Sequence, residues 1–273
     1  MSEMKTIFKI LIILISIPMS AQSVKETWET YIASYDNNKP GSTTVRMDLI
    51  NSTPIKDYNF VLVTGIKYES NRQDGFPENK TFEKLSKVNN KLIKLLNNCC
   101  SNIIVGSFTY EFERLEYFYL KTDKGIKQKI EKLYKTKFPN DKYYVNIKED
   151  KNWKYYTDFL YPNQETINYI ADAKVVKKLV ESGDKLTKER RVDHWIYFSN
   201  KADLNSFKKK IIELKFNIEP SMKKDSLQPY EIRIWRTDKV DLNSINSITN
   251  QLRKLSERFN GDYDGWETSV ETE

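Results

Sequence analysis

The only imidazole in the chain sets the first limit on its chemistry. The 273-residue sequence has one histidine, His194, directly after Asp193. A His-rich metal site is therefore excluded, and any nucleophile–His–acid triad has a single candidate base. The acids Asp262, Asp264 and Glu267 could complete a mixed metal site only by converging on His194. We expect no metal there, because neighbouring residues of a strand point to opposite faces.

The two cysteines are adjacent, Cys99 and Cys100. Neighbouring Cα atoms lie about 3.8 Å apart, below the separation of roughly 4.4–6.8 Å that disulfides prefer. We expect two thiols at the end of a helix, with a redox or intermolecular role as the alternative. No G-x-S-x-G, glycine-rich phosphate loop or H-E-x-x-H occurs. The sequence thus predicts no catalytic residue and no cofactor, and leaves a carboxylate-based hydrolase as an alternative.

The end of the chain is acidic. Residues 260–273 contain five acids and no Lys or Arg. Such a segment either contacts a basic partner or keeps a sheet edge from aggregating by its charge. Together with the segment around the histidine, it supplies the candidate partner-binding residues, which are Asp193, His194, Trp195, Asp262, Asp264, Trp266 and Glu267. We expect His194 to be half exposed at the start of its strand.

The net charge of +7 is small for a chain in which 30% of the residues are charged. An excess of this kind is typical of a soluble surface, whereas nucleic-acid binding proteins concentrate Lys and Arg in a stripe. The run Lys208–Lys210 lies off the apolar face of its helix and is expected to face solvent. We therefore expect a protein partner and no nucleic acid if the chain is exported.

The N-terminus has the pattern of a secretory signal peptide. Lys5 and Lys9 flank the start of the apolar run Ile10–Ile17, and the small residues Ser20, Ala21 and Ser23 follow. A basic start, a short apolar stretch and a small-residue exit are typical of such peptides. The run is too short to span a bilayer comfortably, since spanning takes roughly 20 apolar residues. No later segment is apolar enough to cross a membrane.

The predicted signal peptide covers residues 1–23, with cleavage after Ala21 or Ser23 and a start at Met1 or Met4. It predicts a periplasmic or secreted protein, and an uncleaved N-terminal anchor is the alternative.

The first half of the mature chain reads as alternating strands and helices. A helix is indicated by apolar residues that recur every three or four positions, Phe82, Leu85, Val88, Leu92 and Leu95. A second helix starts at Asp123. Segments rich in β-branched and aromatic residues predict strands at 43–50, 59–68, 102–111, 114–122 and 142–148. After the first strand the order is β-α-β-β-α-β, and the aromatic segment 153–162 is expected to pack across this unit.

The second half repeats this order. A helix over 164–182 and a charged linker over 185–191 lead into it. Asn200 and Asp241 are expected to cap two further helices. Strands are predicted at 193–199, 216–221, 229–237 and 262–270, with Asn260 and Gly261 as a left-handed helix stop.

These patterns predict an α+β fold, two tandem ferredoxin-like sandwiches with antiparallel sheets. The expected domains are 24–165 and 166–273. The two halves could instead join edges into one extended sheet.

The last hundred residues carry three motifs, VDHWIYF at 192–198, VDL at 240–242 and GDYDGWET at 261–268. In these motifs the chain from about Thr166 to Glu271 resembles the family of regulator of ribonuclease E activity B, RraB. The resemblance implies a protein that binds another protein and modulates it, since members of that class bind and restrain an RNA-degrading endonuclease.

The segment from about Trp28 to Pro162 resembles a bacterial domain of unknown function, family 695. The motifs are YDN at 35–37, KPG at 39–41, DGFP at 74–77, EYFY at 116–119 and WKYYTDFLYP at 153–162. This resemblance implies no activity. The resulting expectation is an exported, non-enzymatic binding protein of unknown target. A cytoplasmic ribonuclease E-type regulator is the alternative if the N-terminus is not a signal.

Overall fold

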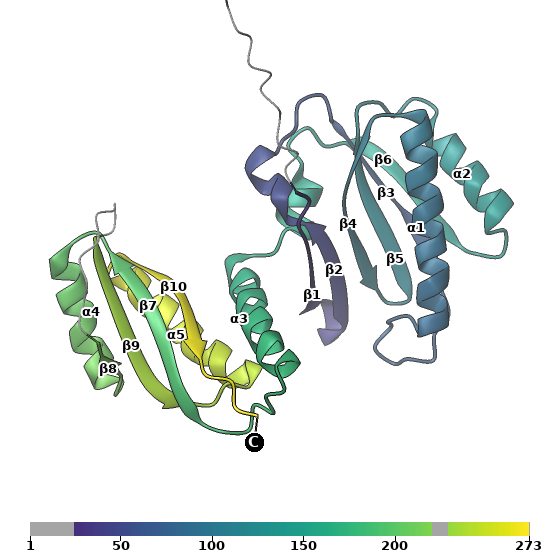
Figure 1. Cartoon of the computed structure of the whole chain (residues 1–273). Coiled ribbons are helices and arrows are strands. Elements are labelled where there is room, and N and C mark those ends of the chain that lie inside the picture. Colours follow the sequence, from purple (N-terminus) through teal and green to yellow (C-terminus); the bar gives the residue numbers. More distant parts are fainter. Residues whose placement is uncertain (1–24, 220–228, 273) are drawn as a thin grey trace, which may run out of the picture.

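The computed structural model describes residues 25–219 and 229–272 (Figure 1). The predicted signal peptide, residues 1–23, lies outside these residues. Two sheet-and-helix units follow each other along the chain, and helix α3 (Gln164–Glu181) stands between them. Within the described parts of the chain, no helix is long and apolar enough to cross a membrane.

The N-terminal unit is a six-stranded antiparallel sheet in the order β1-β2-β4-β5-β3-β6. Its two helices are α1 (Asn79–Cys99) and α2 (Ile126–Lys137). The order β6-β3-β5-β4 is that of a ferredoxin-like β-α-β-β-α-β unit, and β2 and β1 extend it at one edge. The strands are β1 (Trp28–Ser34), β2 (Pro40–Arg46), β3 (Phe60–Lys67), β4 (Asn102–Tyr110), β5 (Glu113–Leu120) and β6 (Tyr143–Glu149).

Both faces of this sheet are covered. Helices α1 and α2 pack on one face over residues such as Leu62 and Phe118. The opposite face is covered by two short helices, the 3-10 helix η2 (Met47–Ser52) and the π-helix η3 (Tyr155–Leu160). A strand buried on both faces needs a continuous apolar run rather than an alternating one, which explains the sequence FVLVTGI of β3. The prediction that 153–162 packs across this unit is confirmed.

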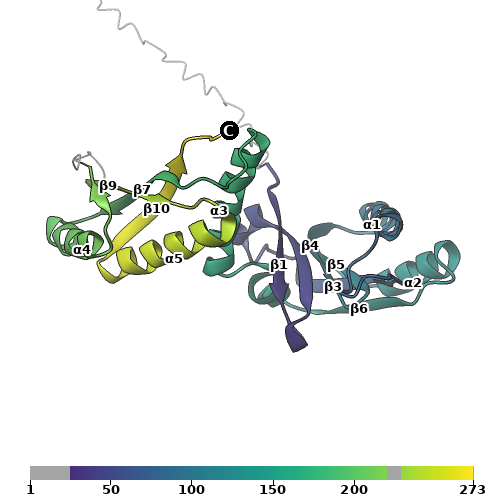
Figure 2. The same ribbon diagram turned by 90° about the horizontal axis from the view of Figure 1, so that it is seen from below.

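The C-terminal unit is a four-stranded antiparallel sheet in the order β10-β7-β9-β8. Helices α4 (Lys201–Glu213) and α5 (Leu242–Arg258) lie on one side of it (Figure 2). This is again the ferredoxin-like order, so the predicted α+β class with antiparallel sheets is confirmed. The strands are β7 (Arg190–Phe198), β8 (Asn217–Ile218), β9 (Tyr230–Asp238) and β10 (Gly261–Thr268).

The predicted helix ends of this unit are confirmed. The side chain of Asn200 accepts a hydrogen bond from the backbone of Asp203, and that of Asp241 accepts one from Ser244. Asn260 adopts φ +52°, the left-handed conformation that ends α5 before β10 begins.

Helix α3 packs against both units. Ile170 contacts the apolar cluster under η3 of the N-terminal sheet. Val176 and Leu179 are buried in a cluster with Trp266 of β10. The side chain of Asn163 caps the start of the helix by accepting from the backbone of Thr166. One helix thus supplies side chains to the cores of two sheets.

The two sheets stay separate, as predicted, so the alternative of one extended sheet is wrong. Other details of the sequence prediction are also wrong. The strand predicted at 43–50 ends at Arg46, and the 3-10 helix η2 follows it. Strand β1 was not predicted, because Tyr31 is its one buried side chain and WETYIAS is mostly polar. Of the strand predicted at 216–221, the described residues form only Asn217–Ile218, and residues 220–221 lie outside the described parts of the chain.

Candidate partner-binding surface

Strand β7 separates the predicted site residues onto two faces. The odd-numbered residues of β7, which include Asp193 and Trp195, point away from α4 and α5. The even-numbered residues, which include His194 and Ile196, point into the core. The strand pairing places Trp235 of β9 and Glu267 of β10 beside Asp193. We call the side of the sheet opposite to α4 and α5 the open face, formed by Arg191, Asp193, Trp195, Tyr197, Arg233, Trp235, Asp262 and Glu267.

Asp193 contacts two arginines of the open face. Its carboxylate accepts a hydrogen bond from Arg191, with Nε at 2.9 Å from Oδ2, and another from Arg233, with Nε at 2.8 Å from Oδ1. A second nitrogen of Arg191 lies 2.8 Å from Oδ1. Burial acts to raise the pKa of Asp193, but the hydrogen bonds from the two guanidinium groups lower it below its usual value. The carboxylate is therefore charged and holds both arginines in place.

Each of these arginines lies over a tryptophan. The guanidinium carbon of Arg191 is 4.4 Å from the ring centroid of Trp235, and that of Arg233 is 5.0 Å from the ring of Trp195. Both indoles are half-buried. Guanidinium groups stack on aromatic rings with a favourable cation–π energy. Side chains that are already paired lose little freedom on binding, so this face is preorganised for a partner.

The edge of the open face has room above Trp195. The pairing of β7 and β10 shifts between Tyr263 and Gly265, and Gly265 lies opposite Trp195. A Cβ added at Gly265 would meet nothing within 4 Å. The residue in the shift is the exposed Asp264. This bulge leaves one side of the Trp195 indole uncovered by the neighbouring strand.

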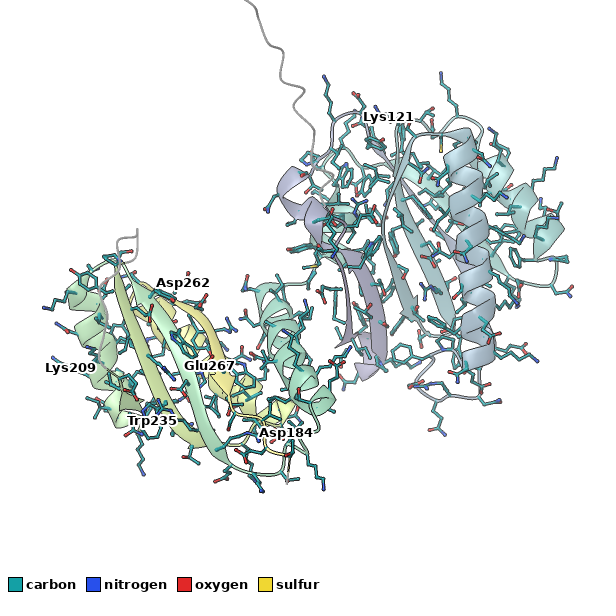
Figure 3. All side chains as sticks on the ribbon, in the orientation of Figure 1. Lys121, Asp184, Lys209, Trp235, Asp262 and Glu267 are labelled. Atoms are coloured by element: carbon teal, nitrogen blue, oxygen red, sulfur yellow. The ribbon has the colours of Figure 1, made fainter. Side chains whose placement is uncertain are left out.

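Acidic side chains border this space. Figure 3 shows Asp262 and Glu267 on β10. It shows Trp235 on β9, which is separated from β10 by β7. Glu267 lies 3.9 Å from Arg233. In the part of the chain that the structure describes, the side chains of Asp262 and Asp264 make no hydrogen bond or ion pair. The border therefore carries negative charge that a basic partner would neutralise.

His194 does not belong to the open face. Its side chain is fully buried, and Nδ1 lies 2.8 Å from the hydroxyl of Tyr263. Nε2 has no hydrogen-bond partner among the described residues. Burial, and then the positive charge of Arg236, lower the pKa of His194 from 6.5 to about 3. The expectation of a half-exposed histidine is wrong, because β7 is a central strand whose inner side lies under the helices.

Trp266 also points inward. It is 8% exposed, and its Nε1 donates a hydrogen bond of 3.0 Å to Asp172 of α3. The same carboxylate accepts from Thr249 at 2.6 Å and from Asn246 at 2.9 Å. Trp266 therefore fastens α3 to the C-terminal unit, and its ring is not free for a partner.

Asp172 was missed by sequence reasoning, although a signal was present. It lies three, four and seven positions before Val175, Val176 and Leu179, and so falls on the apolar face of the predicted helix. A buried carboxylate must be hydrogen-bonded, so an acid on an apolar helix face indicates donors nearby.

The residues that could carry catalysis or hold a metal do not lie together in the described parts of the chain. Asp193 and His194 lie on opposite faces, as predicted. No group of three or more His, Cys, Asp or Glu side chains within residues 25–219 and 229–272 is placed to hold a metal ion. Cys99 and Cys100 are free thiols at the end of α1. Burial, and then the neighbouring Cys99, raise the pKa of Cys100 to about 12.

The fold and this surface define the class of the protein: two ferredoxin-like α+β modules in tandem, the second with a bare Arg–Trp sheet face. Family models match both modules. Residues 26–161 match the family of unknown function DUF695, and residues 169–268 match the family Regulator of ribonuclease activity B. The two matches follow each other along the chain in the predicted order, and we call the unit that residues 169–268 match the RraB domain.

Comparison with solved structures gives weak likenesses. One is an unknown protein from Galdieria sulphuraria, with 10% identity and a TM-score of 0.21, covering 78% of this chain and 99% of the other. Another is a putative glycine cleavage system transcriptional repressor, with 10% identity and a TM-score of 0.23, covering 77% and 98%. Neither likeness carries an argument about function. None of the curated proteins compared with the chain matches it.

Proposed function

We propose that the protein is an exported, non-enzymatic binding protein whose RraB domain docks a partner protein on its open face. The observation that carries this proposal is the pair of half-buried tryptophans, Trp195 and Trp235, held under arginines that Asp193 positions. Trp and Arg are the residues that most often dominate the energy of protein interfaces. The match to a regulator family supports a role in binding rather than in chemistry.

The open face is tested by site-specific photo-crosslinking in cells. A photoreactive phenylalanine analogue replaces Trp235, and in a matched control it replaces Ile212, which is 63% exposed on α4 at the other side of the sheet. We expect discrete protein adducts from position 235 and none from 212. The Trp195→Ala variant should remove those adducts. Equal labelling from both positions would contradict a specific surface.

Export rests on the pattern of residues 1–23 and is tested separately. Fractionation of a C-terminally tagged protein, with N-terminal sequencing of the mature form, should give a periplasmic or secreted chain that begins after Ala21 or Ser23. A full-length protein in the membrane fraction would indicate the uncleaved anchor instead.

A second candidate function follows from the RraB match at 169–268. If the chain stays full-length in the cytosol, we propose that it regulates a ribonuclease E-type enzyme. The test is binding of the purified chain to that endonuclease, with Trp235→Ala as the comparison. Binding that is lost in this variant would assign the open face to the nuclease.

A further inference from the structure

A groove of about 930 Å³ lies between the two units. One wall is four consecutive residues of β1, Glu29 to Ile32. The other wall is one face of α3, with residues at helical spacing, Thr166, Tyr169, Ile170, Ala173, Lys174 and Lys177. Ligand sites commonly occupy roughly 300–1,000 Å³ and often lie between domains. This groove is separate from the open face of the RraB domain.

The strand wall is a backbone edge. Consecutive strand residues alternate between the two faces of a sheet, so a groove lined by four in a row is lined by the edge of the strand. β1 is the outermost strand of the six. Within the described residues, the backbone of β1 is hydrogen-bonded only to β2. Its outer N–H and C=O groups therefore face the groove.

Of the features that usually prevent strand pairing, this edge has one, the charged Glu29, which is paired with Lys174 of α3. Proteins blunt exposed edges with bulges, Lys, Pro or very short strands. β1 pairs with β2 over seven residues without a register shift, and its sequence WETYIAS has no Lys or Pro. By contrast, β10 has a bulge and acids, and β8 has two residues. Such an intact edge is suited to pairing with another extended chain.

The side chains around the groove favour an uncharged occupant. Ile32 is 64% exposed and Tyr169 is 42% exposed, one on each wall. Of the charged residues on the walls, Glu29 is paired with Lys174 across the groove and Lys177 with Glu181. Glu165, in the first turn of α3, lies at one end of the groove and has no ion pair among the described residues. The middle of the groove therefore has apolar surface and no spare charge.

We propose that this groove binds an extended polypeptide segment without charged side chains, which joins the N-terminal sheet as a seventh strand beside β1. Backbone hydrogen bonds to the strand edge supply affinity in this mode, and side chains at alternate positions supply specificity. One row of side chains packs on Ile32, and the helix wall around Ala173 limits their size.

The probe is a blocked synthetic peptide of alternating Thr and Val, as long as the seven residues of β1. It is titrated into the isotope-labelled full chain and followed by NMR. We expect shifts at the backbone amides of β1 and slower hydrogen exchange there. A peptide of the same sequence that is N-methylated at every residue has no backbone donor on either edge and should bind at least about tenfold more weakly, about 1.4 kcal/mol.

Two variants place the site. Ala173→Arg fills the groove from its helix wall, and we expect it to weaken binding of the Thr/Val peptide at least about tenfold. Val180→Arg is the control, since Val180 is 52% exposed on the same helix and outside the groove. Three results overturn the proposal: no binding to the wild type at millimolar peptide, equal binding by Ala173→Arg that folds normally, or equal binding of the N-methylated peptide.

The groove and the open face are tested independently. Trp195→Ala and Trp235→Ala should leave binding of the Thr/Val peptide unchanged, whether or not they abolish capture of a protein partner. A loss of peptide binding in these variants would contradict the assignment to the groove.

Discussion

Asp172 and Trp266 are joined by a hydrogen bond of 3.0 Å between the carboxylate and the indole, and 94 positions separate them in the chain. This bond ties α3 to the last strand of the RraB domain. Asp172 is 1% exposed, and its carboxylate also accepts hydrogen bonds from Thr249 and Asn246. These three donors have the carboxylate as their acceptor in place of water, so the position of α3 depends on Asp172.

Replacing this carboxylate should cost stability. Asp172→Ala leaves buried donors without an acceptor, which costs about 1–3 kcal/mol for each. Trp266→Phe removes only one donor and should cost less. The measurement is the free energy of unfolding in urea, combined as a double-mutant cycle with Asp172→Ala. A coupling energy near zero would show that the indole hydrogen bond does not hold α3 in place.

His194 should make the protein sensitive to acid. Its folded pKa is about 3, against 6.5 for the unfolded chain. Between these values only the unfolded state binds the proton at this site, so stability is full above pH 6.5 and is lost as the pH falls toward 3. We expect the free energy of unfolding to fall more for the wild type than for His194→Gln between pH 7 and pH 4.

The comparison with the variant is needed because Asp193 contributes in the same direction. Its lowered pKa gives stability above the usual aspartate range that is also lost in acid. Asp193 is present in both proteins, and the groups facing the ring, Tyr263, Arg236 and Arg253, are unchanged. An equal loss in wild type and variant would mean that the imidazole is solvated in the native state.

The acidic end of β10 should contribute to partner binding. Asp264→Lys with Glu267→Lys reverses two charges at the border of the open face, and capture of a basic partner should fall about five- to tenfold at low salt. Glu83→Lys with Glu257→Lys makes the same change in net charge elsewhere on exposed positions. If both double variants capture the partner equally well, Asp264 and Glu267 only prevent aggregation at the sheet edge.

Cys100 should react slowly with thiol reagents. A thiol is nucleophilic as the thiolate, and a pKa of about 12 leaves little thiolate at pH 8. We expect iodoacetamide to label Cys100 in the native chain much more slowly than in urea, as read by tandem mass spectrometry that distinguishes Cys100 from Cys99 on the same peptide. Rapid native labelling at neutral pH would instead support the redox alternative.

Much of the fold could be predicted because the sequence patterns of its helices and buried strands are clear. The helix over 79–99 repeats its apolar residues every three or four positions, and the strand at 60–67 is a continuous run rich in β-branched and apolar residues. The caps at Asn200 and Asp241 could be predicted because such signals are local. Strand β1 could not, since an edge strand that buries little carries no apolar pattern.

The site was only partly predictable for a different reason. Asp193 and Trp195 of β7 lie beside Glu267 of β10 because these two strands pair, and the motifs that hold the three residues indicate this. Trp235 was missed because the cross-strand partner of Asp193 depends on how β9 aligns with β7. His194 was misplaced because burial is decided by which helices cover a strand.

The bounds of helix α3 differ from the limits of the two family matches. The two family matches end at 161 and begin at 169, yet the helix starts at Gln164 and is capped by Asn163. A fragment that follows the family boundary would lose the cap and first turn of the helix and expose Ile170. The limits of the family matches therefore differ from the limits of the packed units in this chain, and a fragment with the C-terminal unit should include the whole of α3.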